Sequence, residues 1–333
     1  MNTEKIEVAV VGLGVGRWHL QTYKDSKYVK KIYICDFNKN LEKKMIKISK
    51  KVSIAKFDEI LKNKNVKIIS VASYDNYHYS QIIKCLNNKK NVYVEKPICM
   101  NKNELKKIII KQKQTGLYLS SNLVLRSNPL FKQLKKKIKN NFFGSVYYIE
   151  GDYLWGRVNK FYGWRSRLKY YSKIFGAAVH MIDTIIWMLN EKPKFVFAEG
   201  NRIATKNKMK FNTFVILNLI FKNNLIVKIT GNGPCVHPHF HSINIFGSKK
   251  TFLHNHRSIK IFSKKKIDSL KIKSSLYPGK KSRKEVLNSF IYGVVKKDPK
   301  KFQVDTRSVY DVMKICLSAE ESMKTKKRIK INY

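Results

Sequence analysis

The first 120 residues alternate short apolar runs with amphipathic segments at close spacing, and this rhythm restricts the possible folds more than any other feature of the chain. The apolar runs are rich in β-branched residues and cover residues 6–11, 31–35, 66–72, 91–94 and 117–120. The amphipathic segments cover residues 17–26, 41–49, 78–87 and 104–114, the last with Asn101 placed to cap it. Continuous apolar strands separated by helices are typical of a parallel sheet that is covered on both faces. The sequence therefore predicts an α/β, doubly wound parallel sheet at the N-terminus.

A different pattern begins after residue 121. One helix is expected over residues 129–139, and strands then follow at 146–153, 195–201, 213–221, 225–230, 242–246, 251–253 and 259–262, with final helices at 283–296 and 306–324. The turn residues Asn223 and Asn224 join two of these strands as a hairpin. A chain of 333 residues is long enough for two cores. We expect a first domain over residues 1–122 and, over residues 123–333, an α+β domain with an open, mostly antiparallel sheet.

The turn after the first predicted strand carries three glycines, Gly12, Gly14 and Gly16, with Val15 between the last two. A glycine-rich turn between a strand and a helix allows backbone N–H groups to approach a pyrophosphate, which the helix N-terminus then binds. In the usual G-x-G-x-x-G spacing the third glycine stands where this chain has Arg17. The turn nevertheless predicts a Rossmann dinucleotide site, because it follows the first strand.

Asp36 ends the second predicted strand, twenty positions after Gly16. A carboxylate at this place accepts hydrogen bonds from the adenosine ribose hydroxyls and repels a 2′-phosphate. It therefore favours NAD over NADP as the cofactor. The alternative is that Asp36 caps the following helix.

Three further segments carry recognisable motifs: Val-Ala-Ser-Tyr-Asp-Asn-Tyr-His at residues 71–78, Val-Glu-Lys-Pro at 94–97, and Gly-Ala-Ala-Val-His-Met-Ile-Asp at 176–183. Together with the segment 12–19, and in this order, they resemble the glucose-fructose oxidoreductase and inositol dehydrogenase family (Gfo/Idh/MocA). The resemblance extends over nearly the whole chain. It implies a dinucleotide-binding first domain and a second domain that binds substrate and forms oligomers.

The resemblance also implies cofactor contacts beyond the glycine-rich turn and Asp36, namely Ser73, Tyr74, His78, Glu95 and Lys96. Within this set, Lys96 is expected to contact the reacting hydroxyl while Glu95 lies against the cofactor. A lysine next to the positively charged nicotinamide is suited to proton handling. The alternative for Lys96 is a surface lysine that precedes a proline.

His180 and Asp183 are three residues apart, so on a helix they share one face. The family motif here is commonly Asp-x-Gly-x-His-x-x-Asp, so that Gly176 and Ala178 replace the first Asp and the Gly. The resemblance implies that His180 is the acid/base and that Asp183 orients it or binds substrate. A buried core histidine bonded to a carboxylate is the alternative.

The resemblance places four further residues along the substrate cleft: Asn122, Arg126, Trp164 and Arg165. Either arginine could bind a carboxylate or phosphate through two hydrogen bonds, or could simply brace the junction of the domains. His237, His239 and His241 alternate on a strand, which would also suit a zinc site. No carboxylate stands nearby in the sequence, although Cys235 lies two residues before His237. Relatives need no metal, so we expect none.

The composition gives a formal net charge of +47. Lysine predominates over arginine and is dispersed, as in Lys43-Lys44, Lys106-Lys107 and Lys135–Lys137. Nucleic-acid-binding proteins rely on the planar guanidinium group of arginine to bind bases and phosphates. We therefore assign the lysines of this chain to solvated helix faces and loops. A nucleic-acid partner is therefore not expected.

The five cysteines (Cys35, Cys85, Cys99, Cys235 and Cys316) are scattered without a C-x-x-C pair, which favours reduced, mostly buried thiols. No apolar stretch reaches the ~20 residues of a membrane span, and residues 1–7 lack the apolar region of a signal peptide. The sequence therefore predicts a cytoplasmic protein.

These observations predict an NAD(H)-dependent oxidoreductase that transfers hydride between nicotinamide and the hydroxyl or keto carbon of a sugar, cyclitol, sugar acid or nucleotide sugar. His180 would take the hydroxyl proton, assisted by Lys96. An uncovered apolar sheet face in the second domain would join subunits as a homodimer or homotetramer. Two alternatives belong to other classes: a sensor that binds dinucleotide and sugar without turnover, and a basic nucleic-acid-binding protein.

Overall fold

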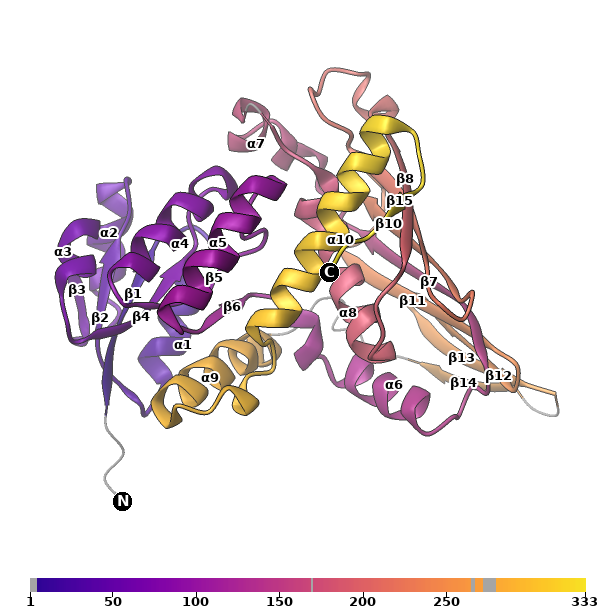
Figure 1. Cartoon of the computed structure of the whole chain (residues 1–333), viewed down its shortest axis with the longest axis horizontal. Coiled ribbons are helices and arrows are strands. Elements are labelled where there is room, and N and C mark those ends of the chain that lie inside the picture. The colour runs from indigo at the N-terminus through magenta and orange to yellow at the C-terminus, as the bar shows by residue number, and fades with distance from the viewer. Residues whose placement is uncertain (1–4, 169, 265–266, 272–279) are drawn as a thin grey trace. The chain divides into compact units, whose positions relative to one another are not determined.

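The computed structural model describes residues 5–168, 170–264, 267–271 and 280–333, and it divides into two units (Figure 1). The first unit contains Met1–Val124 and Lys280–Met313, and the second contains Leu125–Gly279 and Lys314–Tyr333. The expected single boundary after residue 122 thus differs from the structure, in which residues 280–313 return to the first unit. Two hydrogen bonds explain part of this return, because Ser120 Oγ donates to Val304 O over 2.8 Å and Leu119 N donates to Thr306 Oγ1 over 3.2 Å.

A six-stranded sheet forms the centre of the first unit, with strand order β3-β2-β1-β4-β5-β6 and parallel pairing throughout. This order confirms the predicted Rossmann sheet. In folds with this order, ligands generally bind at the carboxyl edge where the order reverses, which here is between β1 and β4. The elements are β1 (Ile6–Val11), α1 (Arg17–Asp25), β2 (Val29–Cys35), α2 (Lys39–Ile46), β3 (Val52–Ile54), α3 (Phe57–Lys62), β4 (Val66–Val71), α4 (His78–Asn87), β5 (Asn91–Val94), α5 (Lys102–Thr115), β6 (Leu119–Ser121) and, near the C-terminus, α9 (Lys280–Lys296).

Local capping explains where α5 begins. The side chain of Asn101 accepts a hydrogen bond from Glu104 N over 2.9 Å, as the sequence predicted. The Glu104 carboxylate reaches back to Met100 N (2.8 Å), one residue before the cap. Gly116 ends the helix in the left-handed conformation, with a φ of +64°.

A nine-stranded sheet forms the second unit, with strand order β14-β13-β12-β11-β7-β10-β9-β8-β15. Only the β7–β10 pair is parallel among the pairs of this sheet that the structure describes, which confirms the predicted open, mostly antiparallel sheet. Its elements are α6 (Pro129–Lys139), β7 (Val146–Leu154), α7 (Trp164–Arg167), α8 (Val179–Leu189), β8 (Phe195–Asn201), β9 (Phe214–Ile220), β10 (Ile226–Asn232), β11 (Phe240–Gly247), β12 (Lys250–His254), β13 (Ser258–Ser263), β14 (Ile267–Lys271), the end of α10 (Thr306–Thr325) and β15 (Ile329–Lys330).

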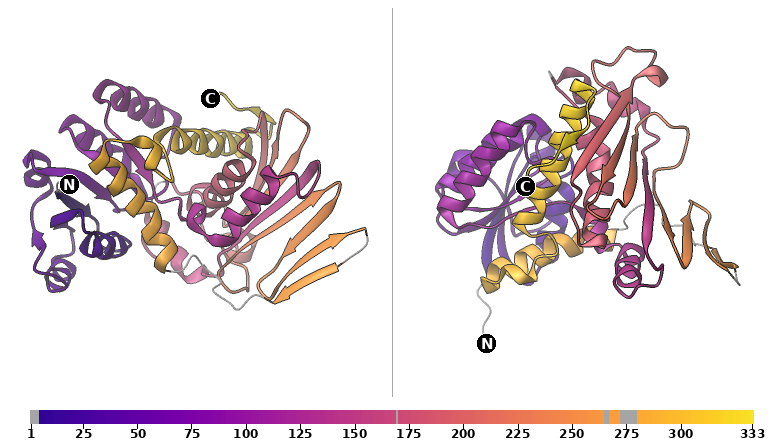
Figure 2. Two further views of the ribbon diagram at one scale, coloured as in Figure 1. Left: turned by 90° about the horizontal axis from the view of Figure 1, so that it is seen from below. Right: turned by 45° about the vertical axis from the view of Figure 1, so that its right-hand side comes forward.

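The helices of this unit gather on one face of its sheet (Figures 1 and 2). Helix α8 lies so close that a Cβ added to Gly151 on β7 would be 2.7 Å from Ile185 Cδ1 and 3.1 Å from Met181 Cε. Within the described ranges, no helix lies on the opposite face (Figure 2). None of the described helices is long and apolar enough to cross a membrane.

Candidate active site

The glycine-rich turn after β1 is built by close backbone contacts. Gly12 has a φ of +87°, and a Cβ there would lie 2.6 Å from the backbone of Ala72 and Ser73. A Cβ on Gly16 would collide with the Gly12 carbonyl oxygen and lie 2.8 Å from Val10 Cγ1. Gly16 therefore provides the close helix–strand packing expected of the third glycine, one residue early, directly before α1 begins.

The outer side of the same turn is open. A Cβ on Gly14 would meet no atom within 4 Å, and both Gly14 and Val15 are exposed. Backbone groups at the start of α1 can therefore be approached by a ligand, and the helix N-terminus favours an anionic one. This geometry fits the pyrophosphate of a dinucleotide.

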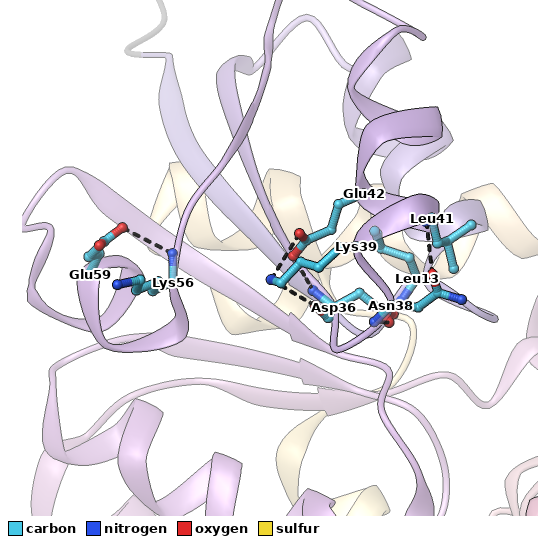
Figure 3. Close-up of polar contacts among 8 residues, drawn as sticks. All are labelled: Leu13, Asp36, Asn38, Lys39, Leu41, Glu42, Lys56 and Glu59. Atoms are coloured by element: carbon cyan, nitrogen blue, oxygen red, sulfur yellow. Dashed lines mark hydrogen bonds and ion pairs between the residues drawn. The ribbon is translucent and has the colours of Figure 1, made fainter.

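Asp36 ties the end of β2 to the glycine-rich turn (Figure 3). Its buried carboxylate accepts hydrogen bonds from Leu13 N over 2.5 Å and from Asn38 N over 2.8 Å. The residue that caps α2 is Asn38, whose side chain accepts from Leu41 N, so Asp36 is not the helix cap. A second carboxylate, Glu42, accepts from the Asp36 amide over 2.8 Å.

An aromatic pair lies beyond Asp36. The rings of Phe37 and Tyr74 follow the carboxyl ends of β2 and β4, with centroids 5.7 Å apart, and Phe37 is 79% exposed. Tyr74 was predicted as a cofactor contact, and its aromatic neighbour Phe37 was not singled out from the sequence. The only sequence signal for Phe37 is its apolar side chain directly after Asp36.

His78 is fully buried at the start of α4 and connects two turns. Its Nδ1 lies 2.6 Å from Pro97 O, and its Nε2 lies 3.1 Å from Ser73 O. Ser73 itself donates through Oγ to Gln81 Oε1. The imidazole thus holds the turn after β5, which carries Lys96, against the end of β4.

Glu95 is the centre of a buried hydrogen-bond network next to Lys96. Its Oε1 accepts from Asn122 Nδ2 over 2.6 Å and lies 3.2 Å from His19 Nε2. Tyr93 extends the network, because its hydroxyl donates to Asn122 Oδ1 over 2.8 Å and its ring packs edge-on against His19. Asn122, predicted as a substrate residue, is therefore engaged with Glu95 and Tyr93.

The network determines the charge of Glu95. Burial raises the pKa of the carboxyl group, but the hydrogen bond from His19, the positive charge of Lys96 and the hydrogen bond from Asn122 outweigh burial and bring the pKa below its usual value. A carboxylate thus lies next to Lys96 at the carboxyl end of β5. Sequence reasoning missed the role of His19, although the residue stands in the first turn of α1.

In the second unit, Asp183 forms a buried ion pair with Arg126. Arg126 Nε donates to Oδ1 and Oδ2 over 3.0 and 3.1 Å, and Arg126 Nη2 donates to Oδ1 over 2.6 Å. The two side chains are only 4% and 1% exposed. Two residues predicted to contact substrate are thus bound to each other and join the segment before α6 to α8.

His180 lies one turn before Asp183 on α8, buried among aromatic rings. Its ring packs edge-on against Tyr153 at 5.8 Å and against His241 at 6.1 Å. Tyr153 and His241 are cross-strand neighbours of β7 and β11 and stack at 4.2 Å, while His239 Nε2 lies 2.7 Å from the Tyr153 hydroxyl. In the described part of the chain, no group of three or more His, Cys, Asp or Glu residues could hold a metal ion.

Trp164 and Arg165 begin helix α7 and lie together. The Arg165 guanidinium stacks 4.3 Å from the centre of the Trp164 ring, and its Nε donates to the Tyr171 hydroxyl over 3.2 Å. Tyr171 in turn packs against Gly176, where a Cβ would collide with its hydroxyl oxygen. These two predicted substrate residues therefore border the position at which the family motif carries an acid.

The first unit thus has the fold and the glycine-rich turn of a dinucleotide-binding oxidoreductase, and comparison with known proteins gives the same class. The profile described as an oxidoreductase family with an NAD-binding Rossmann fold matches residues 6–123, and the Gfo/Idh/MocA C-terminal domain matches residues 131–253. The protein belongs to the Gfo/Idh/MocA family of oxidoreductases.

Individual relatives are distant. Myo-inositol 2-dehydrogenase of Thermotoga maritima is 25% identical over 188 residues, so that the chain spans about half of that relative (54% of each chain). The crystal structure of myo-inositol 2-dehydrogenase from Lactobacillus plantarum has a TM-score of 0.84 at 17% identity, covering 99% of this chain and 100% of that one. Scyllo-inositol dehydrogenase from Lactobacillus casei, with bound NAD(H) and scyllo-inositol, has a TM-score of 0.82 at 15% identity over 98% and 99%. At such identities the structural likeness establishes the fold.

Proposed function

We propose that the protein is an NAD(H)-dependent dehydrogenase that interconverts a hydroxyl and a keto group on a cyclitol or sugar-like substrate. The observation that carries this proposal is the ionised Glu95 beside Lys96, at the same edge of the parallel sheet as the glycine-rich turn and Asp36. Carboxyl ends of parallel strands share one edge, which is where doubly wound sheets bind ligands. Inositol dehydrogenases among the relatives support the substrate class.

The first unit would hold the dinucleotide through three groups of residues. The turn at Gly12, Gly14 and Gly16 faces the pyrophosphate, Asp36 accepts from the adenosine ribose, and Phe37 with Tyr74 flanks the adenine ring. When bound, the cofactor supplies the hydride acceptor or donor. The protein's own task is to orient this group and to exclude water from it.

His180 is the proposed acid/base, and its surroundings suit that role. Burial among aromatic rings limits the orientations of the imidazole, while the Arg126–Asp183 ion pair fixes α8 one turn further along. We assign this pair a positioning role instead of direct contact with substrate. We assign Lys96 a contact with the reacting hydroxyl and His78 a positioning role, because the His78 ring is buried behind the Lys96 turn.

The dehydrogenase itself is tested by screening cyclitols, sugars, sugar acids and nucleotide sugars for substrate-dependent change in nicotinamide absorbance. At least one substrate should give turnover with the purified full-length chain. Binding of NADH and a polyol without turnover of any compound would favour the non-catalytic sensor.

Cofactor choice gives a second prediction. NADH should bind more tightly than NADPH, because the Asp36 carboxylate repels a 2′-phosphate. Asp36→Asn should narrow the ratio of the two dissociation constants by about tenfold, the scale of one charge pair in a partly buried site. Fluorescence titration of both nucleotides measures the ratio.

The control is Glu42→Gln, which removes the neighbouring carboxylate that binds the Asp36 amide. This variant should retain the preference for NADH. Equal affinity of the unmodified protein for both nucleotides would contradict the assignment of Asp36.

We also propose a cytoplasmic homo-oligomer formed through the helix-free face of the nine-stranded sheet. That face presents Tyr148, Ile226 and Phe246 around the polar row formed by Glu150 and Lys228. A mixed apolar and charged sheet face of this kind suits a symmetric partner. Light scattering of the purified protein measures the subunit number, and a monomer at micromolar concentration would contradict it.

A further inference from the structure

A cluster of basic and aromatic side chains surrounds the position where the family motif has an acid. The segment 155–182 contains no Asp or Glu. Its described basic residues are Arg157, Lys160, Arg165, Arg167 and Lys173. A carboxyl group does reach the segment from α10, because Tyr170 and Ser172 both donate to Glu320, whose pKa is raised by burial. Basic residues therefore outnumber acidic ones here.

Tyr171 occupies the space that a side chain at position 176 would take. A Cβ built on Gly176 would collide with the Tyr171 hydroxyl oxygen and lie 2.9 Å from Tyr171 Cζ. The phenol is 5% exposed and is held edge-on by Phe211, with ring centroids 4.7 Å apart. In place of a carboxylate, this chain thus has a neutral hydroxyl group, which keeps a hydrogen-bonding oxygen and removes a negative charge.

Arg165 adds a positive charge to the same place. Its Nε donates to the Tyr171 hydroxyl, and its Nη1 lies 3.5 Å from Lys160 O. No ion pair between Arg165 and a carboxylate occurs among the residues that the structure describes. A guanidinium group has five N–H donors in a planar fork, so these two contacts leave donors for a carboxylate or phosphate.

Aromatic rings hold two of the basic groups in the cluster, those of Arg165 and Lys173. The Arg165 guanidinium lies 4.3 Å from the centre of Trp164 and 5.5 Å from that of Trp155. The buried Nζ of Lys173 lies 3.6 Å from the centre of the same Trp155 ring. Stacking of this kind orients the Arg165 guanidinium without neutralising it, so an anion that approaches Arg165 still meets a positive charge.

We propose that Arg165 and Tyr171 form an anion subsite and that the substrate is an anionic polyol, which carries a carboxylate or a phosphate in addition to its hydroxyl groups. Gly176 precedes His180 by four residues, so the subsite lies about one helical turn from the acid/base. The polyol part of this inference rests on the proposed dehydrogenase function, whereas the anion part rests on the cluster alone.

Tryptophan fluorescence provides a binding measurement that does not require turnover, because Trp155 and Trp164 border the subsite. The full-length protein is titrated with D-glucuronate, D-glucose 6-phosphate and D-glucose. At least one of the two acids should bind about tenfold or more tightly than glucose, with a dissociation constant that rises with salt. The stronger of the two acids identifies the anion as carboxylate or phosphate.

Four variants distinguish specific binding at the subsite from a general effect of positive charge. Arg165→Gln should weaken binding of the preferred acid by about tenfold to a hundredfold and leave glucose unaffected, since charge-assisted hydrogen bonds are lost. Arg165→Lys should bind the preferred acid with intermediate affinity, because lysine keeps the positive charge and lacks the planar fork. Tyr171→Phe should weaken binding of the acid severalfold, although the ring over Gly176 is kept. The exposed Arg167→Gln, two residues away on α7, is the matched control and should bind as the unmodified protein does.

Acids that bind no more tightly than glucose, or not at all, would overturn the anion subsite, as would equal losses in Arg165→Gln and Arg167→Gln. Circular dichroism of each variant establishes that it is folded before it is titrated. The nicotinamide absorbance screen tests the dehydrogenase separately. Turnover of neutral polyols alone would reject only the subsite, whereas acid-selective binding without any turnover would reject only the dehydrogenase.

Discussion

Replacement of His180 by alanine is expected to lower kcat by ~100-fold to 10,000-fold, the usual contribution of a positioned acid or base. The dissociation constant of NADH should change little, because His180 lies in the second unit and the proposed dinucleotide contacts lie in the first. Steady-state kinetics with the substrate found by screening, together with a fluorescence titration of NADH, measures both quantities.

Lys96→Ala should also lower kcat, and the double variant should lose less than the product of the two single losses if both residues serve one proton transfer. His256→Ala is the matched control, since it removes an imidazole from the turn between β12 and β13 and should leave kcat unchanged. Near-normal turnover by both single variants would reject this pair and direct attention to another proton acceptor, such as Tyr153.

Much of the fold could be predicted because its signals are local. The apolar runs of β1 and β4 are buried along their whole length or nearly so, as a doubly covered sheet requires. The hairpin of β9 and β10 was visible in Asn223 and Asn224, and Asn224 has the φ of +61° that such a turn favours. Strand β3 and helix α3 were missed because three and six residues are too few to show a period.

The rest of the fold depends on contacts between distant segments. Residues 280–313 join the first unit through hydrogen bonds such as that from Ser120 to Val304, between residues 184 positions apart. Periodicity describes each helix by itself and carries no information about such a partner. The predicted boundary at 122 therefore identified where the first unit is interrupted and missed its return.

In the candidate site, too, residues with local sequence signals could be predicted, and their partners from distant segments could not. Residue type and spacing were enough to select Gly16 and Asp36, and the family resemblance selected Lys96, because each belongs to a motif with a fixed place on the sheet edge. The partners of the selected residues could not be predicted: His19 lies 76 positions from Glu95, and Arg126 lies 57 positions from Asp183. The second pairing shows that Arg126 and Asp183, both predicted to contact substrate, also form a buried ion pair with each other.

Acidification below pH 6.5 is expected to destabilise the protein through two buried histidines of the second unit. Burial, with a smaller contribution from the charge of His254, lowers the pKa of His241 from 6.5 to about 3. Burial likewise lowers the pKa of His254 to about 4. Tyr153, His180 and His239 are among the polar side chains whose rings contact His241. The folded protein therefore keeps His241 neutral at pH values where the unfolded chain binds a proton.

Acidification therefore lowers the free energy of unfolding, because the unfolded chain binds a proton at His241 that the folded protein does not bind. Well above pH 6.5 neither state is protonated at His241, so the full stability is present, and it is lost as the pH falls through 6.5 toward 3. Each pH unit within this window removes ~1.4 kcal/mol of unfolding free energy per histidine, or on the order of 5 kcal/mol for His241 over the whole window. Carboxyl groups of ordinary pKa are half-protonated near pH 4 and titrate mainly below pH 5, whereas burial raises the pKa of Glu320. The difference in slope between variant and unmodified protein from pH 6.5 to 5.0 therefore isolates His241.

The test compares His241→Phe and His241→Gln with the unmodified protein by denaturant unfolding at several pH values in this interval. Phenylalanine keeps a ring stacked on Tyr153, glutamine keeps a polar side chain, and neither residue titrates. Both variants should therefore show a pH slope of unfolding free energy that is shallower by up to ~1.4 kcal/mol per pH unit, whatever their stability at pH 7. Two variants that differ from the unmodified protein only by a constant offset, with the same slope, would show that His241 is protonated in the folded state and would contradict the expected acid sensitivity.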